Sequence, residues 1–282
     1  MTRQLPFVRS CAFVAFSFLA AAFAGSAPAG AESQTTPASL TALNVCGSSI
    51  VAFTEDDVSG FPAPCVAAPG SLIIETVYFQ NASRVGGTAL AAYPLVRLRT
   101  GIASRLEVVL DTPSQIAESG LHGLGLYPTT HLGYGLNYNV LATSRMALGI
   151  GSELVPQSSR FTVNAHQPRY VADFNLGYRV GDRTTISALA DGASSQSVGF
   201  NRIAPAATLR VAYDSGPSTQ LSTDFGSRLV ARNANLQKYA DVALNERVRK
   251  NITYSVGLGT TFNPVGNEKT HYLASGFDFH LR

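Results

Sequence analysis

The chain has 282 residues, of which 14% are charged and 45% are hydrophobic. An ordinary soluble domain carries about 25% charged residues, and a disordered chain is more charged and less apolar still. A helical membrane protein with several spans needs several apolar runs of about 20 residues, whereas this chain has one such run, at its N-terminus. The composition therefore excludes disorder and a bundle of membrane helices, and it favours strands.

The first 31 residues have the pattern of a secretory signal. Arg3 and Arg9 precede an apolar run over 11–24, and small residues at 29–31 provide a cleavage site. An uncleaved membrane anchor is the alternative. Cleavage after residue 31 leaves 19 basic and 18 acidic residues, so the basic charge of the full chain does not indicate nucleic acid as a partner.

Residues 32–70 are rich in Ser, Thr, Ala and Pro, and we expect a periplasmic leader or a plug of the barrel rather than a separate domain. Cys46 and Cys65 are the two cysteines that remain after cleavage. In an oxidising compartment such a pair most simply forms a disulfide. A metal site would need further ligands, and no His lies near these cysteines in the sequence.

From residue 71 onwards, apolar and polar residues alternate with a period of two. Residues 272–281, for example, place Leu273 and Phe277 on one face and Ala274 and Asp278 on the other. Such alternation over nine to eleven residues, with a small or polar second face, is typical of membrane-spanning strands. The predicted strands are 71–80, 90–100, 104–112, 130–141, 145–154, 168–180, 183–191, 204–213, 218–229, 239–249, 252–262 and 271–281.

The connections between these segments alternate between short and long, the long ones including 113–129, 155–167 and 192–203. Bacterial barrels have short periplasmic turns and longer external loops. The sequence therefore predicts an all-β fold, a transmembrane antiparallel up-and-down β-barrel of about 12 strands over 71–282, in the bacterial outer membrane. A soluble secreted β protein is the alternative.

Two predicted strands carry a charge on their apolar face. Glu75 shares a face with Ile73 and Val77, and Glu246 shares a face with Leu244. A charge that faces lipid is costly. We therefore expect Glu246 near the periplasmic interface or at a β-bulge.

Many charged residues fall on the inward face of the predicted strands. If the first hairpin centres on Ile102, Arg97 lies opposite Glu107 and Arg99 lies opposite Arg105, and a hairpin centred on Gly216 places Thr208 opposite Asp224. These charges either fill and rigidify a narrow barrel or create a transverse field that orients polar or anionic solutes. The candidate lumen residues are Arg97, Arg99, Arg105, Glu107, Asp173, Arg179, Arg210, Asp224, Arg228, Asp241, Arg247, Arg249 and Asp278.

No catalytic motif emerges from the sequence. There is no HExxH, no GxSxG, no P-loop and no spaced cluster of His and Cys. Twelve-stranded outer-membrane barrels include a phospholipase, but the stretch around His166 lacks the Ser that its site requires. We expect no catalytic residue, no metal and no cofactor.

Two stretches resemble the outer-membrane transporter-like family of the meta-pathway of phenol degradation. Residues 69–76 (PGSLIIET) look like its opening strand, and 93–108 (YPLVRLRTGIASRLEV) resemble its Arg-x-Gly hairpin followed by Arg and Glu. The resemblance covers roughly 69–282 and implies an outer-membrane barrel for uptake or export of small, often aromatic, molecules. The residues that match are Glu75, Arg97, Arg99, Gly101, Arg105 and Glu107.

The sequence thus predicts an outer-membrane channel or transporter for small, possibly aromatic or hydrophobic, molecules. A non-conducting structural or adhesive barrel is the alternative, and a barrel lipid hydrolase ranks third. The partners implied are outer-membrane lipids and lipopolysaccharide, the barrel assembly machinery and a small-molecule solute, with no nucleic acid. Barrels of this kind usually end in an aromatic residue, whereas this chain ends in Phe279-His280-Leu281-Arg282. This ending either weakens the expected assembly signal or shifts it to Phe279.

Overall fold

The computed structural model describes residues 64–83, 89–112, 115–120, 123–128, 132–155, 169–197, 200–230, 235–263 and 268–281. The predicted signal sequence (1–31) and Cys46 lie outside these residues, and only 64–70 of the leader are described. The signal, the disulfide and the leader as a unit therefore stay predictions. Within the described residues, no helix is long and apolar enough to cross a membrane.

All long elements in the described part of the chain are strands. They are β1 (Leu72–Ser83), β2 (Ala89–Ala103), β3 (Leu106–Thr112), β4 (Gln115–Gly120), β5 (Gly123–Pro128), β6 (Gly133–Ala142), β7 (Met146–Val155), β8 (Arg169–Arg179), β9 (Thr184–Ser197), β10 (Phe200–Asp214), β11 (Thr219–Val230), β12 (Asn235–Arg249), β13 (Ile252–Asn263) and β14 (Glu268–Leu281).

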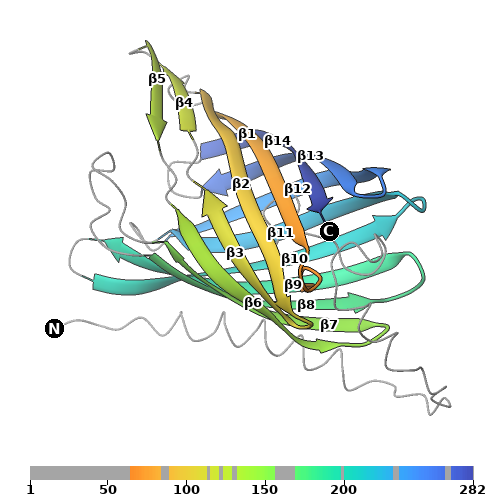
Figure 1. Cartoon of the computed structure of the whole chain (residues 1–282). Coiled ribbons are helices and arrows are strands. Elements are labelled where there is room, and N and C mark those ends of the chain that lie inside the picture. The colour runs from red at the N-terminus through yellow and green to blue at the C-terminus, as the bar shows by residue number, and fades with distance from the viewer. Residues whose placement is uncertain are drawn as a thin grey trace. The chain divides into compact units, whose positions relative to one another are not determined.

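Twelve of these strands form a closed antiparallel barrel (Figure 1). The ring runs from β1 through β2 and β3 to β6 and then through every strand to β14. It closes because β1 pairs with both β2 and β14. These twelve strands correspond to the twelve predicted from the period-two pattern, so the predicted fold class is confirmed.

The two ends of the barrel differ in their connections. The turn end carries the short turns 104–105, 143–145, 180–183, 215–218 and 250–251, and β1 begins and β14 ends there. The other end, the loop end, carries connections such as 84–88 and 156–168. The prediction of a long loop over 192–203 was wrong, because β9 and β10 remain paired as far as Ser197 and Phe200.

The long connection predicted over 113–129 contains an additional hairpin, formed by β4 and β5, which the sequence pattern did not predict. β2 pairs with β3 along Val96–Ala103 and with β4 along Ala89–Tyr93. β3 and β4 therefore pair with successive lengths of the same neighbouring strand, β2. In Figure 1 this hairpin projects beyond the strands of the ring.

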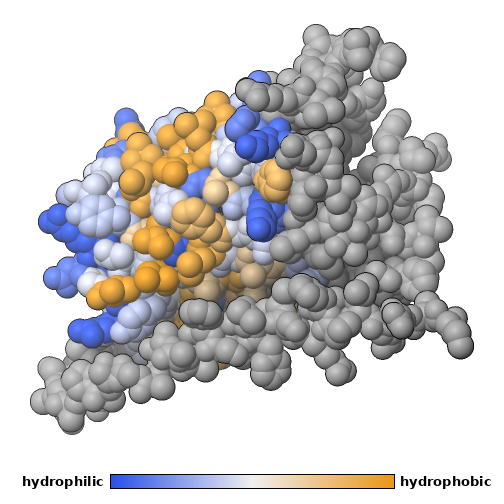
Figure 2. All heavy atoms as spheres, turned by 180° about the vertical axis from the view of Figure 1, so that it is seen from behind, coloured by the Kyte–Doolittle hydropathy of each residue, from blue (hydrophilic) through white to orange (hydrophobic). Residues whose placement is uncertain are grey.

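Along the strands of the ring, large apolar side chains point out of the barrel. Along β12, for example, Val242 and Leu244 are exposed while Asp241, Ala243 and Asn245 are buried. Large apolar side chains are exposed around the ring, and Leu258 on β13 reaches 63% exposure. Figure 2 shows such side chains gathered over one face of the barrel. An apolar outside and a polar inside is the reverse of a soluble protein and matches a barrel in lipid.

Glu246 is the charge that the pattern places on the lipid-facing side of β12. It lies opposite Thr219, the first residue of β11, and therefore near the turn end. The Ser218 hydroxyl donates to its Oε1 at 2.9 Å, and the Thr219 hydroxyl donates to its Oε2. A β-bulge follows between Arg247 and Arg249. Glu246 therefore lies near a strand end and next to a bulge, where the two hydroxyls stabilise the carboxylate; the predicted periplasmic interface stays a prediction.

Candidate functional site in the barrel lumen

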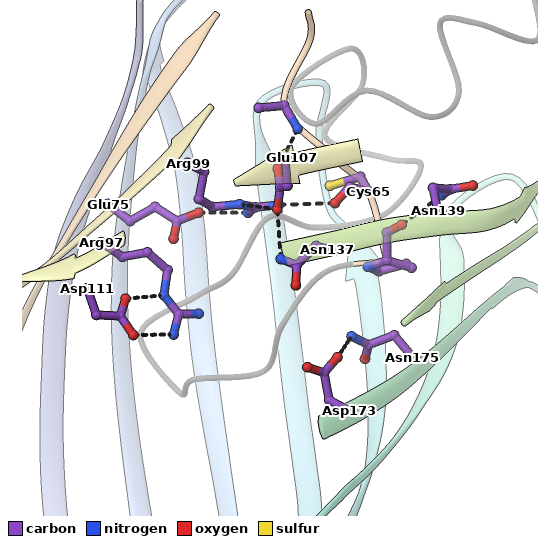
Figure 3. Close-up of polar contacts among 12 residues, drawn as sticks. Cys65, Glu75, Arg97, Arg99, Glu107, Asp111, Asn137, Asn139, Asp173 and Asn175 are labelled. Atoms are coloured by element: carbon purple, nitrogen blue, oxygen red, sulfur yellow. Dashed lines mark hydrogen bonds and ion pairs between the residues drawn. The ribbon is translucent and has the colours of Figure 1, made fainter. Parts of the chain in front are cut away.

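A buried ion cluster lies inside the barrel near the turn end, on β1, β2 and β3. Arg99 donates from Nη1 to Glu75 Oε1 at 2.8 Å and from Nε to Glu107 Oε1 at 2.9 Å (Figure 3). Asn137 on β6 also donates to Glu107 Oε1, at 2.7 Å. Arg99 and Glu107 are both 0% exposed. Two carboxylates around one guanidinium compensate the charge that burial would otherwise make costly.

The strand registers bring these three charges together. Glu75 lies opposite Arg97 on β2, and Glu107 lies opposite Gly101, so each carboxylate is one diagonal step away from Arg99. Diagonal neighbours on one face of a sheet are within reach of long side chains. Glu75 thus has a role in the lumen, and its position on the same face as Ile73 reflects an inward face rather than a lipid-facing one.

The chain segment before β1, Pro64–Gly70, lies against this cluster inside the barrel. Arg99 donates from Nη2 to the carbonyl oxygen of Cys65 at 3.0 Å, and the amide of Ala67 donates to Glu107 Oε2 at 2.6 Å. Asn139 on β6 donates to the carbonyl oxygen of Pro64 at 2.7 Å. Residues 64–67 are buried. The wall therefore binds the segment through its backbone.

A second ion cluster lies farther toward the loop end on the same wall. Arg97 donates to Asp111 through two parallel bonds of 2.7 and 3.0 Å, and its Nη2 lies 3.5 Å from Glu153 Oε2 on β7. The side chains of Arg97 and Asp111 are 33% and 26% exposed. The boundary between buried and solvated lumen therefore lies between Arg97 and Arg99 on β2.

The facing wall carries a third ion pair, Arg210 with Asp224. Their strands, β10 and β11, lie six places around the ring from β2 and β3. Both side chains are almost fully buried, and two bonds of 2.7 and 2.6 Å join them. Nearby, the Tyr272 hydroxyl donates to Asp241 Oδ2 at 2.5 Å. Arg210 and Asp224 thus pair within a single hairpin.

The registers predicted for the two hairpins were wrong. The first hairpin turns at 104–105 after a bulge between Gly101 and Ala103, which sets Arg97 opposite Asp111 rather than Glu107. In the β10–β11 hairpin, Arg210 rather than Thr208 lies opposite Asp224. The sequence pattern defines which face a residue takes, whereas the turn length and the bulge set the register.

The other candidate lumen residues take several positions. Asp173, Arg179, Asp241, Arg247 and Asp278 lie on inward phases of their strands. Two predictions are corrected: Arg105 lies in the turn after β2 and is exposed, and Arg249, beyond the bulge of β12, is also exposed. The Arg228 side chain lies outside the described residues, although β11 includes its backbone.

Sequence reasoning missed the amide side chains that complete the lumen clusters. Asn137 and Asn139 bind Glu107 and the segment before β1, and Asn175 donates to Asp173 at 3.2 Å. Their signal was present, because all three fall on the small or polar face of strands with clean alternation. Among the described residues, no group of three His, Cys, Asp or Glu is arranged to hold a metal ion.

The closed sheet, the apolar outer surface and the charged inner wall define a transmembrane β-barrel. The chain is similar to the COG4313 outer membrane channel from Pseudomonas putida F1, with a TM-score of 0.59 and 16% identity over 77% of this chain and 97% of that one. The fold and the apolar outer surface together place the protein in the bacterial outer membrane.

Two other solved structures are less similar. A KdgM porin in complex with disordered oligogalacturonate has a TM-score of 0.47 and 12% identity over 73% of this chain and 98% of that one. The CymD monoaromatic hydrocarbon channel has a TM-score of 0.40 and 10% identity over 75% and 87% of the two chains. No family model and no curated protein matches this sequence. Membership in the phenol meta-pathway family therefore stays a prediction.

Proposed function

We propose that this protein is an outer-membrane channel through which small solutes pass. The observation that carries the proposal is the inward face of a closed twelve-stranded ring, which is polar and charged while the outward face is apolar. A ring of this size lies between filled eight-stranded barrels and open sixteen-stranded porins. A narrow path for small molecules fits such a ring, and the likeness to an outer membrane channel supports it.

The inner charges could either rigidify the barrel or orient passing solutes, and the three ion clusters differ in which role they fit. Arg99 and Arg210 are buried and paired with carboxylates of neighbouring strands, so they rigidify the wall. Arg97, Asp111 and Glu153 remain partly exposed. The proposal assigns contact with passing solutes to this second cluster, whose guanidinium and carboxylates lie side by side and orient polar groups.

The proposed solutes are small molecules, including aromatic or hydrophobic ones. The resemblance of 69–76 and 93–108 to the phenol meta-pathway family supports this class. Two inward tyrosines add to it, because Tyr239 and Tyr272 lie across Gly226 and Gly259 of the neighbouring strands. Such rings line the inner wall of β12 to β14 with aromatic surface.

The proposal includes the steps that deliver the protein to its membrane. A signal over 1–31 is removed after export, Cys46 and Cys65 form a disulfide in the periplasm, and the barrel assembly machinery inserts 71–282. The turn end then faces the periplasm, because short turns do so in bacterial barrels. Lipids and lipopolysaccharide surround the apolar outer surface.

Single-channel current across a planar bilayer tests the proposal, with protein whose folding is first shown by heat-modifiable gel migration. We expect discrete current steps, and solutes that interrupt these steps identify the class that passes. A folded barrel that gives no current in any variant described below contradicts the channel. That result would favour the alternative, a non-conducting structural barrel, for which the burial of residues 64–67 inside the barrel is the specific observation.

A further inference from the structure

We propose that the segment Pro64–Gly70 is an inner plug, seated on the wall at the turn end, and that it restricts passage through the channel. The inference rests on the proposed channel function and concerns its regulation. The segment hydrogen-bonds to side chains of β2, β3 and β6, packs against Ile73 of β1 and approaches Gly149 of β7, and these strands are consecutive in the ring. It thus covers one continuous side of the lumen.

The seat is made of wall side chains that bind the backbone of the segment. Arg99 and Asn139 donate to carbonyl oxygens, and Glu107 accepts from the amide of Ala67. At the end of the segment, the Gly70 amide donates to the carbonyl oxygen of Gly101 at 2.9 Å. Backbone groups that leave water need such partners. Four hydrogen bonds along seven residues therefore fix the segment in one conformation.

Two glycines in the wall make room for this backbone. A Cβ atom on Gly101 would lie 2.2 Å from the carbonyl oxygen of Ala67, and one on Gly149 would lie 3.1 Å from Cα of Pro64. The first distance is far below van der Waals contact, so Gly101 permits a close approach that no other residue allows. The segment and the wall are therefore complementary in shape at these points.

Apolar contact accompanies the polar seat. Ile73 points into the barrel from β1 and is buried in a cluster with Cys65 and Ala67 of the segment. An inward isoleucine in a water-filled lumen would leave its side chain solvated, whereas here it is 2% exposed. Burial of apolar surface stabilises the seated segment. The mixed pattern of β1, with Ile73 and Glu75 on one face, thus matches a wall that binds a plug.

The seated segment explains the exposure boundary on β2. Arg99 and Arg97 are both inward, but only Arg97, beyond the segment, is in contact with water. The segment thus shields from solvent the same ion cluster that binds it. Displacing the segment would hydrate Arg99 and Glu107 and widen the path along this wall.

A glycine substitution tests the plug without changing any charge. Gly101→Ala adds a methyl group at the point of closest approach, and Gly181→Ala is the matched control, since a Cβ there meets nothing within 4 Å. Gly149→Val, at the other end of the segment, serves as the second variant if Gly101→Ala does not fold. Heat-modifiable migration establishes folding for each protein.

Two measurements are made on each folded protein. Elastase, which cleaves after small residues, reports whether Val66, Ala67 and Ala68 are accessible, with the cleavage site located by mass spectrometry under reducing conditions. Single-channel current reports the open path. We expect wild type and Gly181→Ala to be protected at 66–68, and Gly101→Ala to be cleaved there with a conductance raised roughly twofold or more, because conductance follows the open pore dimensions.

The outcomes separate the plug from the channel. Cleavage of folded wild type at 66–68 would show that the segment is not seated, and a cleaved Gly101→Ala with wild-type conductance would show that it restricts nothing. Both results contradict the plug and leave the channel intact. Silent wild type with a conducting Gly101→Ala supports both proposals. Silence of a folded and cleaved Gly101→Ala contradicts the channel itself.

Discussion

Arg210 and Asp224 lie directly opposite each other across the β10–β11 hairpin and are joined by two hydrogen bonds inside the barrel. The pair lies across the ring from the Arg99 cluster. Both walls of the turn end are thus held by buried guanidinium–carboxylate contacts. The cluster on β1 to β3 also binds the segment before β1.

Arg210→Gln is expected to destabilise the barrel, because it leaves the Asp224 carboxylate buried without its charge partner. Breaking one side of a buried pair costs about 3–5 kcal/mol. The double variant Arg210→Met with Asp224→Leu is expected to recover most of this loss, because no unpaired charge remains. Urea unfolding of the folded barrel in detergent or lipid measures the free energy of unfolding of both variants. A double variant less stable than Arg210→Gln would contradict the prediction.

Arg97→Glu is expected to shift ion selectivity toward cations. Arg97 is the arginine of the lumen clusters that touches water, and the substitution adds negative charge beside Asp111 and Glu153. The reversal potential in a salt gradient across a planar bilayer measures the shift.

Arg249→Glu is the matched control for this experiment. It makes the same change of charge at an exposed position beyond the bulge of β12. We expect its reversal potential to equal that of wild type. Equal shifts in the two variants would mean that general surface charge, rather than the Arg97 cluster, sets selectivity.

The sequence was sufficient to predict the twelve strands of the ring and the faces of those that alternate cleanly. Lipid requires an apolar outward face and a closed ring tolerates a small or polar inward one, so the alternation in β6, β8, β13 and β14 had one solution. The sequence did not determine the register, that is, which residues of two paired strands lie opposite each other. The bulge between Gly101 and Ala103 changes which residues face each other, and it leaves no mark in the period-two pattern.

The candidate site was predicted in part. Arg99 and Glu107 were selected for their inward phase, but their burial depends on the segment before β1, which no alternation describes. Arg105 and Arg249 were misplaced because strand ends and bulges interrupt the phase. The β4–β5 hairpin was missed because residues 113–129 alternate too briefly to stand out from a loop.

The mature protein is expected to contain no free thiol, because Cys46 and Cys65 are predicted to form a disulfide. Cys65 lies in the segment that contacts the wall and is buried. A cross-link to Cys46 would close a loop next to the seated residues and reduce the entropy gained when they leave the wall. The number of free thiols is measured by thiol titration of denatured protein that was exported to the periplasm and purified without reductant. Two titratable thiols would contradict the pairing.

Gly259→Ala is expected to destabilise the barrel by about 1–3 kcal/mol, which is the usual cost of overpacking a tight contact. Tyr272 lies opposite Gly259 across β13 and β14, and a Cβ atom on Gly259 would lie 2.1 Å from Cζ of its ring. The ring would have to leave the wall and lose the hydrogen bond from its hydroxyl to Asp241.

A double-mutant cycle isolates this contact. Tyr272→Ala removes the ring, so Gly259→Ala in that background is expected to cost close to nothing, and it gains from the lower flexibility of alanine in a strand. Urea unfolding measures the four proteins, with Gly181→Ala as a control whose effect should stay within about 0.5 kcal/mol. Equal costs of Gly259→Ala with and without the ring would show that the glycine is needed for the strand itself. The predicted non-additivity would instead show that the glycine is needed to make room for the ring of Tyr272. Glycines of other sheets are covered by an aromatic ring from the neighbouring strand in the same way.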